Sequence, residues 1–341
     1  MKSRSSSSFL AMNNLETLNE FQNASSIEEF WNALLILHGF LHKSKQDLDF
    51  EEKLSVSALT SLLHNINANY YRFKIPKKSG GSRIIDAPSK ELKLVQNIIN
   101  YALSHFFEVH DATHGFIKSR GIKTNAEVHV GSVFILNIDL KDFFPSVSIT
   151  RIENRLEDLG FSTISARLIG ILCTKNNKLP QGSPASPLIT NIVSTRLDKR
   201  LECFALARGC KYSRYVDDIT FSSMNYVFNA RFEKTLSKII ENEGFRLNIS
   251  KTRILTKSDR QEVTGVIVNE KINVNRKFVR KVRAMIHTLS KEGIYEDRNK
   301  LKPLVMSTLG SLYFIRQIRG ANDPLYLRMN NQLISLLQSY G

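Results

Sequence analysis

Hydrophobic positions along the chain follow two periods, which predict a mixture of helices and short strands. Apolar residues recur at three- and four-residue spacing over many segments, as on the buried face of an amphipathic helix. Phe30, Leu34 and Leu37 are one example of this spacing. The same period predicts helices at about 25–41, 55–66, 88–103, 149–159, 162–174, 186–207, 228–243, 276–290, 301–319 and 324–339.

Short stretches with alternating polarity or with β-branched runs predict strands between these helices. The run 133–138 is apolar and rich in β-branched residues, so it predicts a buried strand that ends at Asp139. Residues 211–222 alternate around Asp217-Asp218, as two strands joined by a tight turn do. Further hairpins are predicted for 71–75 with 83–86, joined by a turn at 77–81, and for 262–268 with 271–274. We find no internal repeat or long linker, which indicates one compact body with a helical C-terminal module.

Charge changes this picture by pointing to a partner. The 341 residues carry a net charge of +16 and a pI near 9.7. A basic balance of this size favours a polyanionic partner, with nucleic acid first and an anionic membrane surface second. Residues 1–60 hold five Lys/Arg and eight Asp/Glu, whereas residues 271–341 hold thirteen and four, a net of +9. Hydrophobic residues (42%) outnumber charged residues (23%), which excludes a mainly disordered, collagen-like or fibrous chain.

Cysteine usage and the lengths of the apolar runs narrow the cellular setting. Cys173, Cys203 and Cys210 show no CxxC spacing, so neither a disulfide scaffold nor a zinc site is expected, and a reducing compartment fits. The longest apolar runs, such as 33–37 and 133–136, are far too short to span a bilayer. No apolar segment follows the Ser-rich N-terminus, as it would in a signal peptide. We therefore expect a cytoplasmic protein without a membrane partner.

Three aspartates stand where chemistry is expected. Asp139 ends an apolar strand, and Asp217 and Asp218 lie together at the tip of a hairpin. Adjacent carboxylates beside apolar strands repel one another and are costly to desolvate unless a cation binds. Mg²⁺ takes one or two carboxylates together with phosphate oxygens, and two such ions can activate a 3′-hydroxyl and stabilise a pyrophosphate leaving group. The alternative is ordinary turn chemistry for the pair and a cap for Asp139.

Four motifs in a fixed order favour the catalytic interpretation. The segments NIDLKDFFPS (137–146), LPQGSP (179–184), YVDD (215–218) and NISK (248–251) resemble, in that order, the motif boxes of reverse transcriptases. Two shorter matches narrow the subgroup: NAEVH (125–129) is similar to the Asn-Ala-x-x-His signature of the retron type, and VTG (263–265) to its Val-Thr-Gly signature. From about residue 70 to 268, the chain therefore resembles the retron-type reverse transcriptases, which are bacterial RNA-directed DNA polymerases.

The resemblance implies an α+β fold, a right-hand polymerase with fingers, palm and thumb. The implied divisions are an N-terminal helical extension (1–65), fingers with a retron-specific insertion (66–132), a palm (133–270, with a fingers segment at about 149–185) and a helical, RNA-binding thumb (271–341). In the palm, Asp139, Asp217 and Asp218 are the implied catalytic and metal-binding residues. They would hold two Mg²⁺ ions, with Mn²⁺ as a substitute.

A nucleotide pocket is also implied, formed by Arg83, Phe144, Gln181, Gly182 and Lys251. The guanidinium of Arg83 would grip the triphosphate. The ring of Phe144 would leave no room for a 2′-hydroxyl, and a plain core position is the alternative for this residue. Gln181 would contact the sugar, Gly182 would let the backbone approach the ligand, and Lys251 would act as a general acid for pyrophosphate departure.

The residues implied to contact primer, template or structured RNA are His114, Arg120, Asn125, His129, Tyr215, Thr264, Gly265, Arg276, Arg280 and Arg283. Arg276, Arg280 and Arg283 recur at helical spacing, so one helical face is basic. Such a face suits a nucleic-acid backbone, and an ordinary solvated face is the alternative. For His129, the residues alone leave a core histidine and an RNA contact open.

The implied function is reverse transcription of a cognate structured noncoding RNA (msr–msd type) into branched multicopy single-stranded DNA. Synthesis would start from the 2′-hydroxyl of a guanosine and use dNTPs. No RNase H acidic cluster is apparent after residue 270, so RNA removal is assigned to a host RNase H. A role in antiphage defence, with a separate effector protein, is also implied. The rivals are a reverse transcriptase of another bacterial lineage (group II intron-like or abortive-infection type) and a catalytically silent RNA-binding scaffold.

Overall fold

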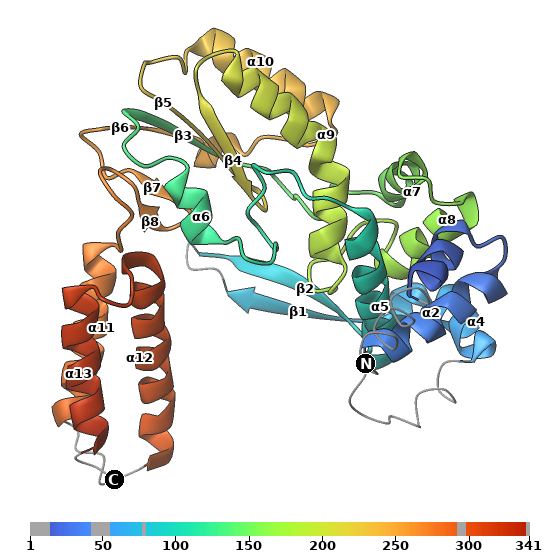
Figure 1. Ribbon diagram of the computed structural model, residues 1–341, viewed down its shortest axis with the longest axis horizontal. Coiled ribbons are helices and arrows are strands. Elements are labelled where there is room, and N and C mark those ends of the chain that lie inside the picture. Colours follow the sequence, from blue (N-terminus) through green and yellow to red (C-terminus); the bar gives the residue numbers. More distant parts are fainter. Residues whose placement is uncertain (1–13, 42–54, 77–79, 292–297, 339–341) are drawn as a thin grey trace, which may run out of the picture. The chain divides into compact units, whose positions relative to one another are not determined.

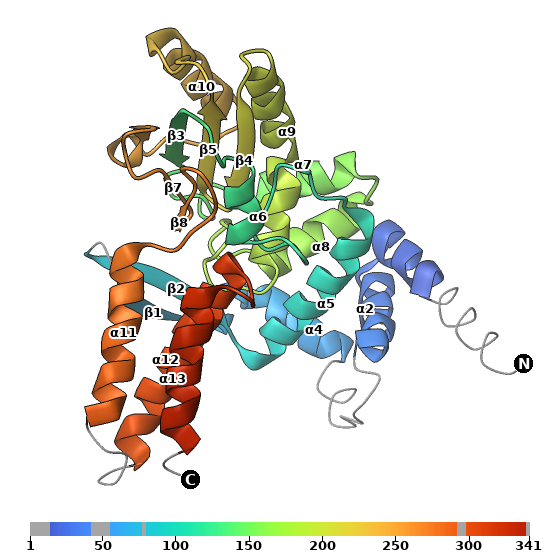
Figure 2. The same cartoon turned by 60° about the vertical axis from the view of Figure 1, so that its left-hand side comes forward.

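The chain folds into two compact units, drawn in Figures 1 and 2. The structure is a computed structural model that describes residues 14–41, 55–76, 80–291 and 298–338. The first unit comprises 1–110, 140–199 and 238–246, and the second comprises 111–139, 200–237 and 247–341. The fingers, palm and thumb boundaries inferred from the resemblance follow a different division and stay a prediction. Parts of the predicted 1–65 extension and the tip of the 77–81 turn lie outside the described residues.

Helices form most of the first unit. Its N-terminal part contains a helix at 14–23, α2 (Ile27–Leu41) and α4 (Val56–His64), and its body contains α5 (Lys90–Phe106), α7 (Ile149–Asp158) and α8 (Thr163–Cys173). Phe21 and Phe30 are fully buried, with ring centroids 5.0 Å apart, and the ring of Phe161 meets Phe21 edge-on. The hydroxyl of Ser165 donates to the carbonyl of Phe21 (2.8 Å), which ties the N-terminal helix to the start of α8. The amphipathic pattern read from the sequence thus marks a buried interface between helices.

A two-stranded hairpin completes the first unit. β1 (Tyr70–Pro76) and β2 (Ser82–Pro88) pair antiparallel, with Tyr70 opposite Pro88 and Pro76 opposite Ser82. Tyr71, Phe73 and Ile75 alternate along one face of β1 and remain exposed. The hairpin predicted for 71–75 and 83–86 is therefore confirmed, with each strand slightly longer than expected.

The second unit contains a four-stranded antiparallel sheet in the order β4-β5-β3-β6. Its strands are β3 (Phe134–Asp139), β4 (Lys211–Tyr215), β5 (Asp218–Ser223) and β6 (Arg253–Thr256). Phe221 of β5 contacts Phe204 near the end of α9 (Ser186–Leu206) and Phe232 of α10 (Ala230–Asn242) through edge-on rings. These aromatic contacts pack α9 and α10 against β5.

Three C-terminal helices pack against one another in the same unit, as Figure 2 shows. They are α11 (Arg276–Lys291), α12 (Arg298–Arg319) and α13 (Pro324–Gln338). Their buried side chains form one cluster with Ile135 of β3 and with the hairpin of β7 (Glu262–Val263) and β8 (Val266–Ile267). Val282 of α11 and Ile315 of α12 are fully buried in this cluster. The helices predicted at 276–290, 301–319 and 324–339 are confirmed, and their separation as a thumb stays a prediction.

Two local predictions need correction. The strand expected at 262–268 is itself a tight hairpin, because Thr264 (φ 47°) and Gly265 (φ 84°) both adopt left-handed backbone and reverse the chain. Its expected partner at 271–274 contributes a single bridge, between Ile267 and Asn273. The sequence reading also missed β6 and the short helix α6 (Ile122–Glu127). Within the described residues, no helix is both long and apolar enough to cross a bilayer.

Candidate active site

The carboxylates predicted to carry the chemistry lie at one end of the second unit's sheet. Asp139 is the last residue of β3 and pairs in register with Asp218, the first residue of β5. Asp217 precedes it in the two-residue turn from β4. Strand pairing therefore places Asp139 and Asp218 opposite each other, although they are far apart in the sequence.

Asp139 is buried, and residues 248–251 hold it through hydrogen bonds. It is 6% exposed, and its Oδ1 accepts a hydrogen bond from Nδ2 of Asn248 at 2.8 Å. Nζ of Lys251 donates to Oδ2, also at 2.8 Å. The backbone N–H of Asn248 donates to the carbonyl of Asp139, which fixes the short helix η2 (Ile249–Lys251) to the end of β3. The Asn-x-x-Lys element seen in the sequence is thus organised around Asp139.

Electrostatics at this end of the sheet favour a cation. Desolvation, followed by repulsion from Asp217 and Asp139, raises the pKa of Asp218 to about 7, and Lys251 opposes this rise. The Asp218 carboxylate is crowded by protein, yet the residue keeps an exposed surface at the turn, so a cation can reach it. The hydrogen bond to Asp139 raises the pKa of the Lys251 ammonium, which therefore stays charged.

The donor set fits a divalent metal whose coordination is completed by substrate. Among the described residues, no three His, Cys, Asp or Glu side chains converge as a ready-made metal cage. Mg²⁺ does not need one, because it usually takes one or two carboxylates and completes its shell with phosphate oxygens and water. Asp139 and Asp218 lie opposite each other in the strand pairing, and Asp217 directly precedes Asp218. The three carboxylates offer the kind of hard oxygen donor that such an ion prefers.

In the first unit, the loop 179–184 is fixed against β2. The backbone N–H of Asp86 donates to the carbonyl of Gln181 at 2.8 Å. Gly182 has φ 129°, and a Cβ at this position would lie 2.7 Å from the carbonyl oxygen of Asp86, so no other residue fits. The next residue, Ser183, donates to the buried amide of Gln96 at 2.7 Å. These contacts leave Gln181 half-buried beside the strand that carries Arg83.

Two other predicted nucleotide-binding residues of this unit have free surface. Arg83 is exposed on β2, opposite Ile75. Phe143 is buried and stacks on Phe245, whereas its neighbour Phe144 is only half-buried. The core position is therefore filled by Phe143, and part of the Phe144 ring remains open to a ligand.

Comparison with known proteins identifies the family to which the chain belongs. Residues 75–268 match the family model described as reverse transcriptase (RNA-dependent DNA polymerase). The chain is 36% identical to the Retron Ec86 reverse transcriptase of Escherichia coli, over 71% of this chain and 76% of that protein. It is also 36% identical to the Retron Mx65 reverse transcriptase of Myxococcus xanthus, over 64% of this chain, but it spans only 56% of that protein.

The chain belongs to the reverse transcriptase family, in its retron type. This membership confirms the predicted class of enzyme, an RNA-directed DNA polymerase, and the predicted α+β right-hand fold. Members of the family use divalent metal ions. Among solved structures, a foamy viral protease–reverse transcriptase in complex with double-stranded DNA is similar, with 18% identity and a TM-score of 0.45, over 83% of this chain and 42% of that one. The assignment to the reverse transcriptase family rests on the sequence matches and not on this structural similarity.

Asn125 and His129, the two polar residues of the first retron signature of this reverse transcriptase, are buried in the second unit. His129 is fully buried, and both ring nitrogens are hydrogen-bonded at 2.7 Å, Nδ1 to the Ser222 hydroxyl and Nε2 to that of Ser213. Burial, followed by the charges of Lys211 and His114, lowers the pKa of His129 to about 3. The ring is therefore neutral and joins β4 to β5, an arrangement that favours the core alternative left open by the sequence.

Asn125 links helix α6 to the short β7–β8 hairpin. It is 1% exposed, and its Nδ2 donates to the hydroxyl of Thr264 at 3.3 Å. Its amide oxygen has no hydrogen-bond partner among the described residues. Gly265, the next residue of the turn, is exposed, and Tyr215 at the end of β4 is half-buried. The two retron signatures thus meet through Asn125 and Thr264.

The side chains of His114 and Arg120, which are predicted to contact the template, form hydrogen bonds within residues 111–124. Nδ1 of His114 is hydrogen-bonded to the Thr124 hydroxyl at 2.9 Å, and burial, followed by the charge of Arg120, lowers the pKa of His114 to about 4. Arg120 forms an ion pair with Asp111 (3.0 Å) and donates to the carbonyl of Thr113. Neighbouring Phe116, with a left-handed φ of 61°, is 56% exposed and is the better placed of these side chains for a ligand.

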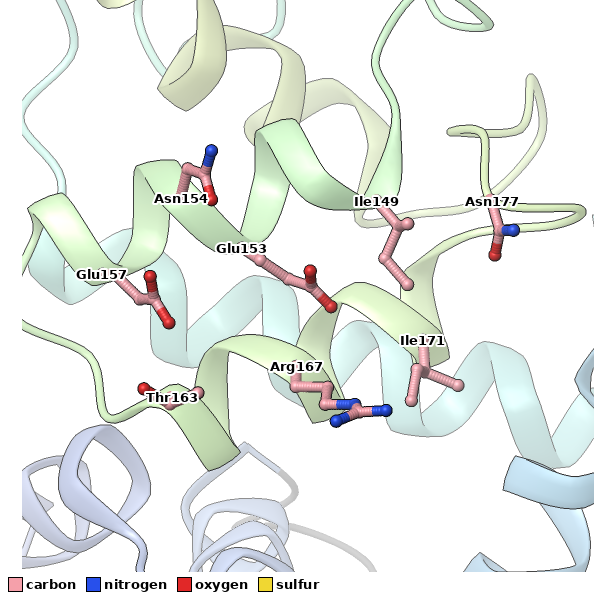
Figure 3. Close-up of a pocket in the computed structure, with 8 residues that line it drawn as sticks. All are labelled: Ile149, Glu153, Asn154, Glu157, Thr163, Arg167, Ile171 and Asn177. Carbon is pink, nitrogen blue, oxygen red and sulfur yellow. The ribbon is translucent and has the colours of Figure 1, made fainter.

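The basic face predicted on α11 is present. Arg276, Arg280 and Arg283 are all exposed, and no ion pair of theirs occurs within the part of the chain that the structure describes. A separate cavity of about 450 Å³ lies between α7 and α8 in the first unit, lined by Glu153, Arg167 and neighbouring side chains (Figure 3). None of the residues predicted from the motifs lines this cavity.

One buried residue beside the aspartates escaped the sequence analysis. Arg214 lies directly before the YVDD motif and is 0% exposed. Alternation along β4 offered no signal for it, because an arginine in a short strand normally reads as a surface residue.

Proposed function

We propose that this enzyme copies a structured noncoding RNA of msr–msd type into branched multicopy single-stranded DNA. Synthesis starts from the 2′-hydroxyl of a guanosine in that RNA and proceeds by template-directed addition of dNTPs. The observation that carries the proposal is the similarity to retron reverse transcriptases over 64–71% of the chain, together with both retron signatures in place. Each whole relative is longer than the matched region, so the priming reaction is inferred for this chain rather than transferred to it.

The catalytic centre of this proposal is the aspartate end of the sheet. Asp139, Asp217 and Asp218 would hold two Mg²⁺ ions, for which Mn²⁺ can substitute. When bound, such ions lower the pKa of the attacking hydroxyl and neutralise charge on the leaving pyrophosphate. Asn248 keeps Asp139 oriented (2.8 Å), and the charged Lys251 lies 2.8 Å from its other oxygen. A proton held on Lys251 Nζ is available to the leaving group, as general acid catalysis requires.

Nucleotide selection is assigned to the first unit. The exposed guanidinium of Arg83 suits a bidentate grip on phosphate oxygens. Gln181 is held by Asp86 at the edge of β2, and Gly182 lets the backbone of the loop approach closely. The free part of the Phe144 ring would exclude a 2′-hydroxyl and so favour dNTPs over rNTPs.

RNA recognition is assigned to α11. Arg276, Arg280 and Arg283 are exposed and form no ion pair among the described residues, which suits phosphate contacts along a duplex or stem. Thr264 and Gly265 form one tight turn, and Tyr215 directly precedes another. All three are proposed to contact the primer end. For His114, Arg120, Asn125 and His129, a role in shaping these turns accounts for the contacts described above.

The wider setting follows from the same proposal. The product would remain joined to its RNA until a host RNase H removes the RNA portion. The RNA–DNA product and the enzyme would act in antiphage defence by restraining a separate effector protein, in the bacterial cytoplasm. A reverse transcriptase of another lineage is the rival to be separated by experiment.

The deciding experiment expresses the chain with its adjacent upstream noncoding DNA and examines total nucleic acid after RNase and debranching treatment. A short discrete DNA whose mobility shifts on debranching is the expected result. If no such DNA forms while the purified protein extends a DNA primer on RNA with Mg²⁺, the priming and subgroup parts of the proposal are wrong. If neither activity is found where a control polymerase works, the RNA-binding scaffold becomes the better explanation.

A further inference from the structure

The turn that carries Asp217 has an unfavourable backbone conformation. Val216 is the first residue of the two-residue connection between β4 and β5, and its φ is 61°. This left-handed region is costly for a β-branched side chain, and tight turns usually place Gly, Asn or Asp there. A strained residue persists only where surrounding contacts force it, and such residues gather at functional sites. The contacts around Val216 should therefore show what enforces this conformation.

A buried arginine holds the strained residue from inside. Nη1 of Arg214 donates to the carbonyl of Val216 at 3.0 Å. Nη2 donates to the hydroxyl of Thr113 at 3.3 Å. Arg214 is 0% exposed, and Thr113 is likewise 0% exposed. Burying the charged guanidinium is costly unless it is hydrogen-bonded. Because the local dielectric constant is low, its hydrogen bond to the Val216 carbonyl is stronger than the same bond in water.

A second chain segment closes over the turn. The backbone N–H of Arg214 donates to the carbonyl of Ala112, and the N–H of His114 donates to the carbonyl of Arg214, both at 2.8 Å. This parallel bridge brings Gly115 against Val216. A Cβ on Gly115 would lie 2.7 Å from both the backbone nitrogen and Cγ2 of Val216. Val216 is thus confined between the Gly115 backbone and the Arg214 guanidinium.

We propose that Arg214 is a positioning residue for the metal-binding aspartates. It acts through the Val216 carbonyl, with Thr113 and Gly115 as its partners, and sets the turn so that Asp217 and Asp218 face the end of β3. The inference rests on the proposed function, because it assumes that these aspartates bind the metal. It goes further by assigning their orientation to a buried residue outside the motif boxes. The competing explanation is a purely structural arginine, whose loss would lower stability and leave metal affinity unchanged.

The test measures metal binding and synthesis separately. Mn²⁺ binding to the purified full chain is followed by electron paramagnetic resonance, and primer extension on an RNA template gives kcat and the KM for dNTP. Groups that orient metal ligands typically contribute about 10–100-fold to metal affinity. Arg214→Gln is therefore expected to weaken Mn²⁺ binding by about 10–100-fold and to lower kcat, with a smaller change in KM. Arg214→Lys, which keeps a donor, should recover part of both.

Matched variants separate positioning from folding. Arg208→Gln is the control, because Arg208 also donates to a backbone carbonyl, that of Phe204 (3.1 Å), but lies away from the turn. Its Mn²⁺ affinity should equal that of the unaltered chain. If Arg214→Gln does not fold, Thr113→Val removes only one partner and should weaken Mn²⁺ binding by a smaller factor. Val216→Gly relieves the strain, so Arg214→Gln should cost less in that background than in the original one.

Two outcomes overturn the proposal. One is wild-type Mn²⁺ affinity in folded Arg214→Gln and Thr113→Val, with any defect confined to the melting temperature. The other is an equal cost of Arg214→Gln with and without Val216→Gly. Asp217→Asn with Asp218→Asn serves as the reference: if that variant also binds Mn²⁺ normally, the proposed metal site has failed and not merely the role of Arg214.

Discussion

The aspartate end of the sheet and the basic face of α11 belong to the same unit but are built in opposite ways. Asp139 is buried with both carboxylate oxygens hydrogen-bonded, and Arg214 behind the turn is fully buried. On α11, Arg276, Arg280 and Arg283 are exposed and form no ion pair within the described residues. The first region fixes a few atoms in place, whereas the second presents charge that can adapt to its partner. The proposed chemistry at one end would therefore depend on position, and the proposed RNA binding at the other would depend mainly on the amount of charge.

Removing the charge of the turn aspartates should give the largest effect. Asp217→Asn with Asp218→Asn keeps the shape of the turn but removes the negative charge that is proposed to hold the metal. Metal ions supply several kcal/mol of transition-state stabilisation, so DNA synthesis should fall by about a thousandfold or more. Because the two carboxylates repel each other, the melting temperature should be unchanged or higher. Primer extension, RNA binding and thermal unfolding measured on the same sample test all three expectations.

Asp158→Asn is the matched control for this variant, since Asp158 is a well-exposed carboxylate paired with Arg155 on α7. It should leave synthesis within about twofold, because exposed ion pairs contribute little. Equal losses of synthesis and of RNA binding in the double variant would contradict the division of labour between the two regions.

Charge removal on α11 should weaken binding without affecting the chemical step. Arg276→Gln, Arg280→Gln and Arg283→Gln together should lower the affinity for structured RNA and reduce the slope of log affinity against log salt by about two to three. The matched control is the triple Gln variant of Arg231, Lys234 and Lys238, which are exposed on α10 at similar helical spacing. If both triple variants change the slope equally, the effect belongs to net charge and α11 is not a specific surface.

Much of the aspartate end could be read from the sequence because its signals are local. The apolar run that ends at Asp139 and the alternation around Asp217-Asp218 each predicted a strand end, and β3, β4 and β5 have those ends. What brings Asp139 opposite Asp218 is the pairing of β3 with β5, which no local pattern encodes. β6 was missed for the same reason: it is a four-residue edge strand specified by its pairing with β3.

The buried residues that hold the site in place were harder to predict than the proposed metal-binding aspartates. Buried polar residues such as Arg214 and His129 look like surface residues in a sequence, and only the fold reveals their partners. Thr264-Gly265 was read as part of a strand because the surrounding residues are apolar, yet its left-handed backbone makes it a turn. Sequence motifs thus identify the groups that perform chemistry more readily than the groups that hold them in place.

Discrimination between dNTP and rNTP tests whether the first unit also depends on the exact position of a side chain. Phe144→Ala removes the free ring and should lower discrimination between dNTP and rNTP by about 10–100-fold, in the range that a single packed group can supply. Phe144→Leu keeps bulk and should retain most of the discrimination. Both are measured as ratios of kcat/KM for matched nucleotides. Unchanged selectivity in Phe144→Ala would remove this residue from the proposed nucleotide pocket.

A substitution of His129 should have the smallest effect. It tests the contrast between buried and exposed regions directly, because the sequence left open whether His129 is a core residue or an RNA contact. His129→Phe fills the ring volume but leaves the hydroxyls of Ser213 and Ser222 without their shared partner. Losing these buried hydrogen bonds should cost about 1–3 kcal/mol of unfolding free energy. RNA affinity of the folded variant should change by less than about twofold if the residue only supports the sheet. His64→Phe, at the exposed end of α4, is the control for histidine loss.

The pH dependence of stability separates the two roles of His129 further. Burial lowers its pKa to about 3 from an ordinary value of 6.5, so the native ring stays neutral while the unfolded ring gains a proton below about 6.5. The stability contributed by the neutral ring is thus complete above pH 6.5 and is lost as the pH falls toward 3, by up to about 1.4 kcal/mol per pH unit. Urea unfolding between pH 4.5 and 7 should show a shallower dependence in His129→Phe than in His64→Phe. The depressed pKa of His114 (about 4) acts in the same direction in both variants, so their difference isolates His129. Equal slopes, or a large loss of RNA affinity with normal stability, would return His129 to the RNA-binding surface.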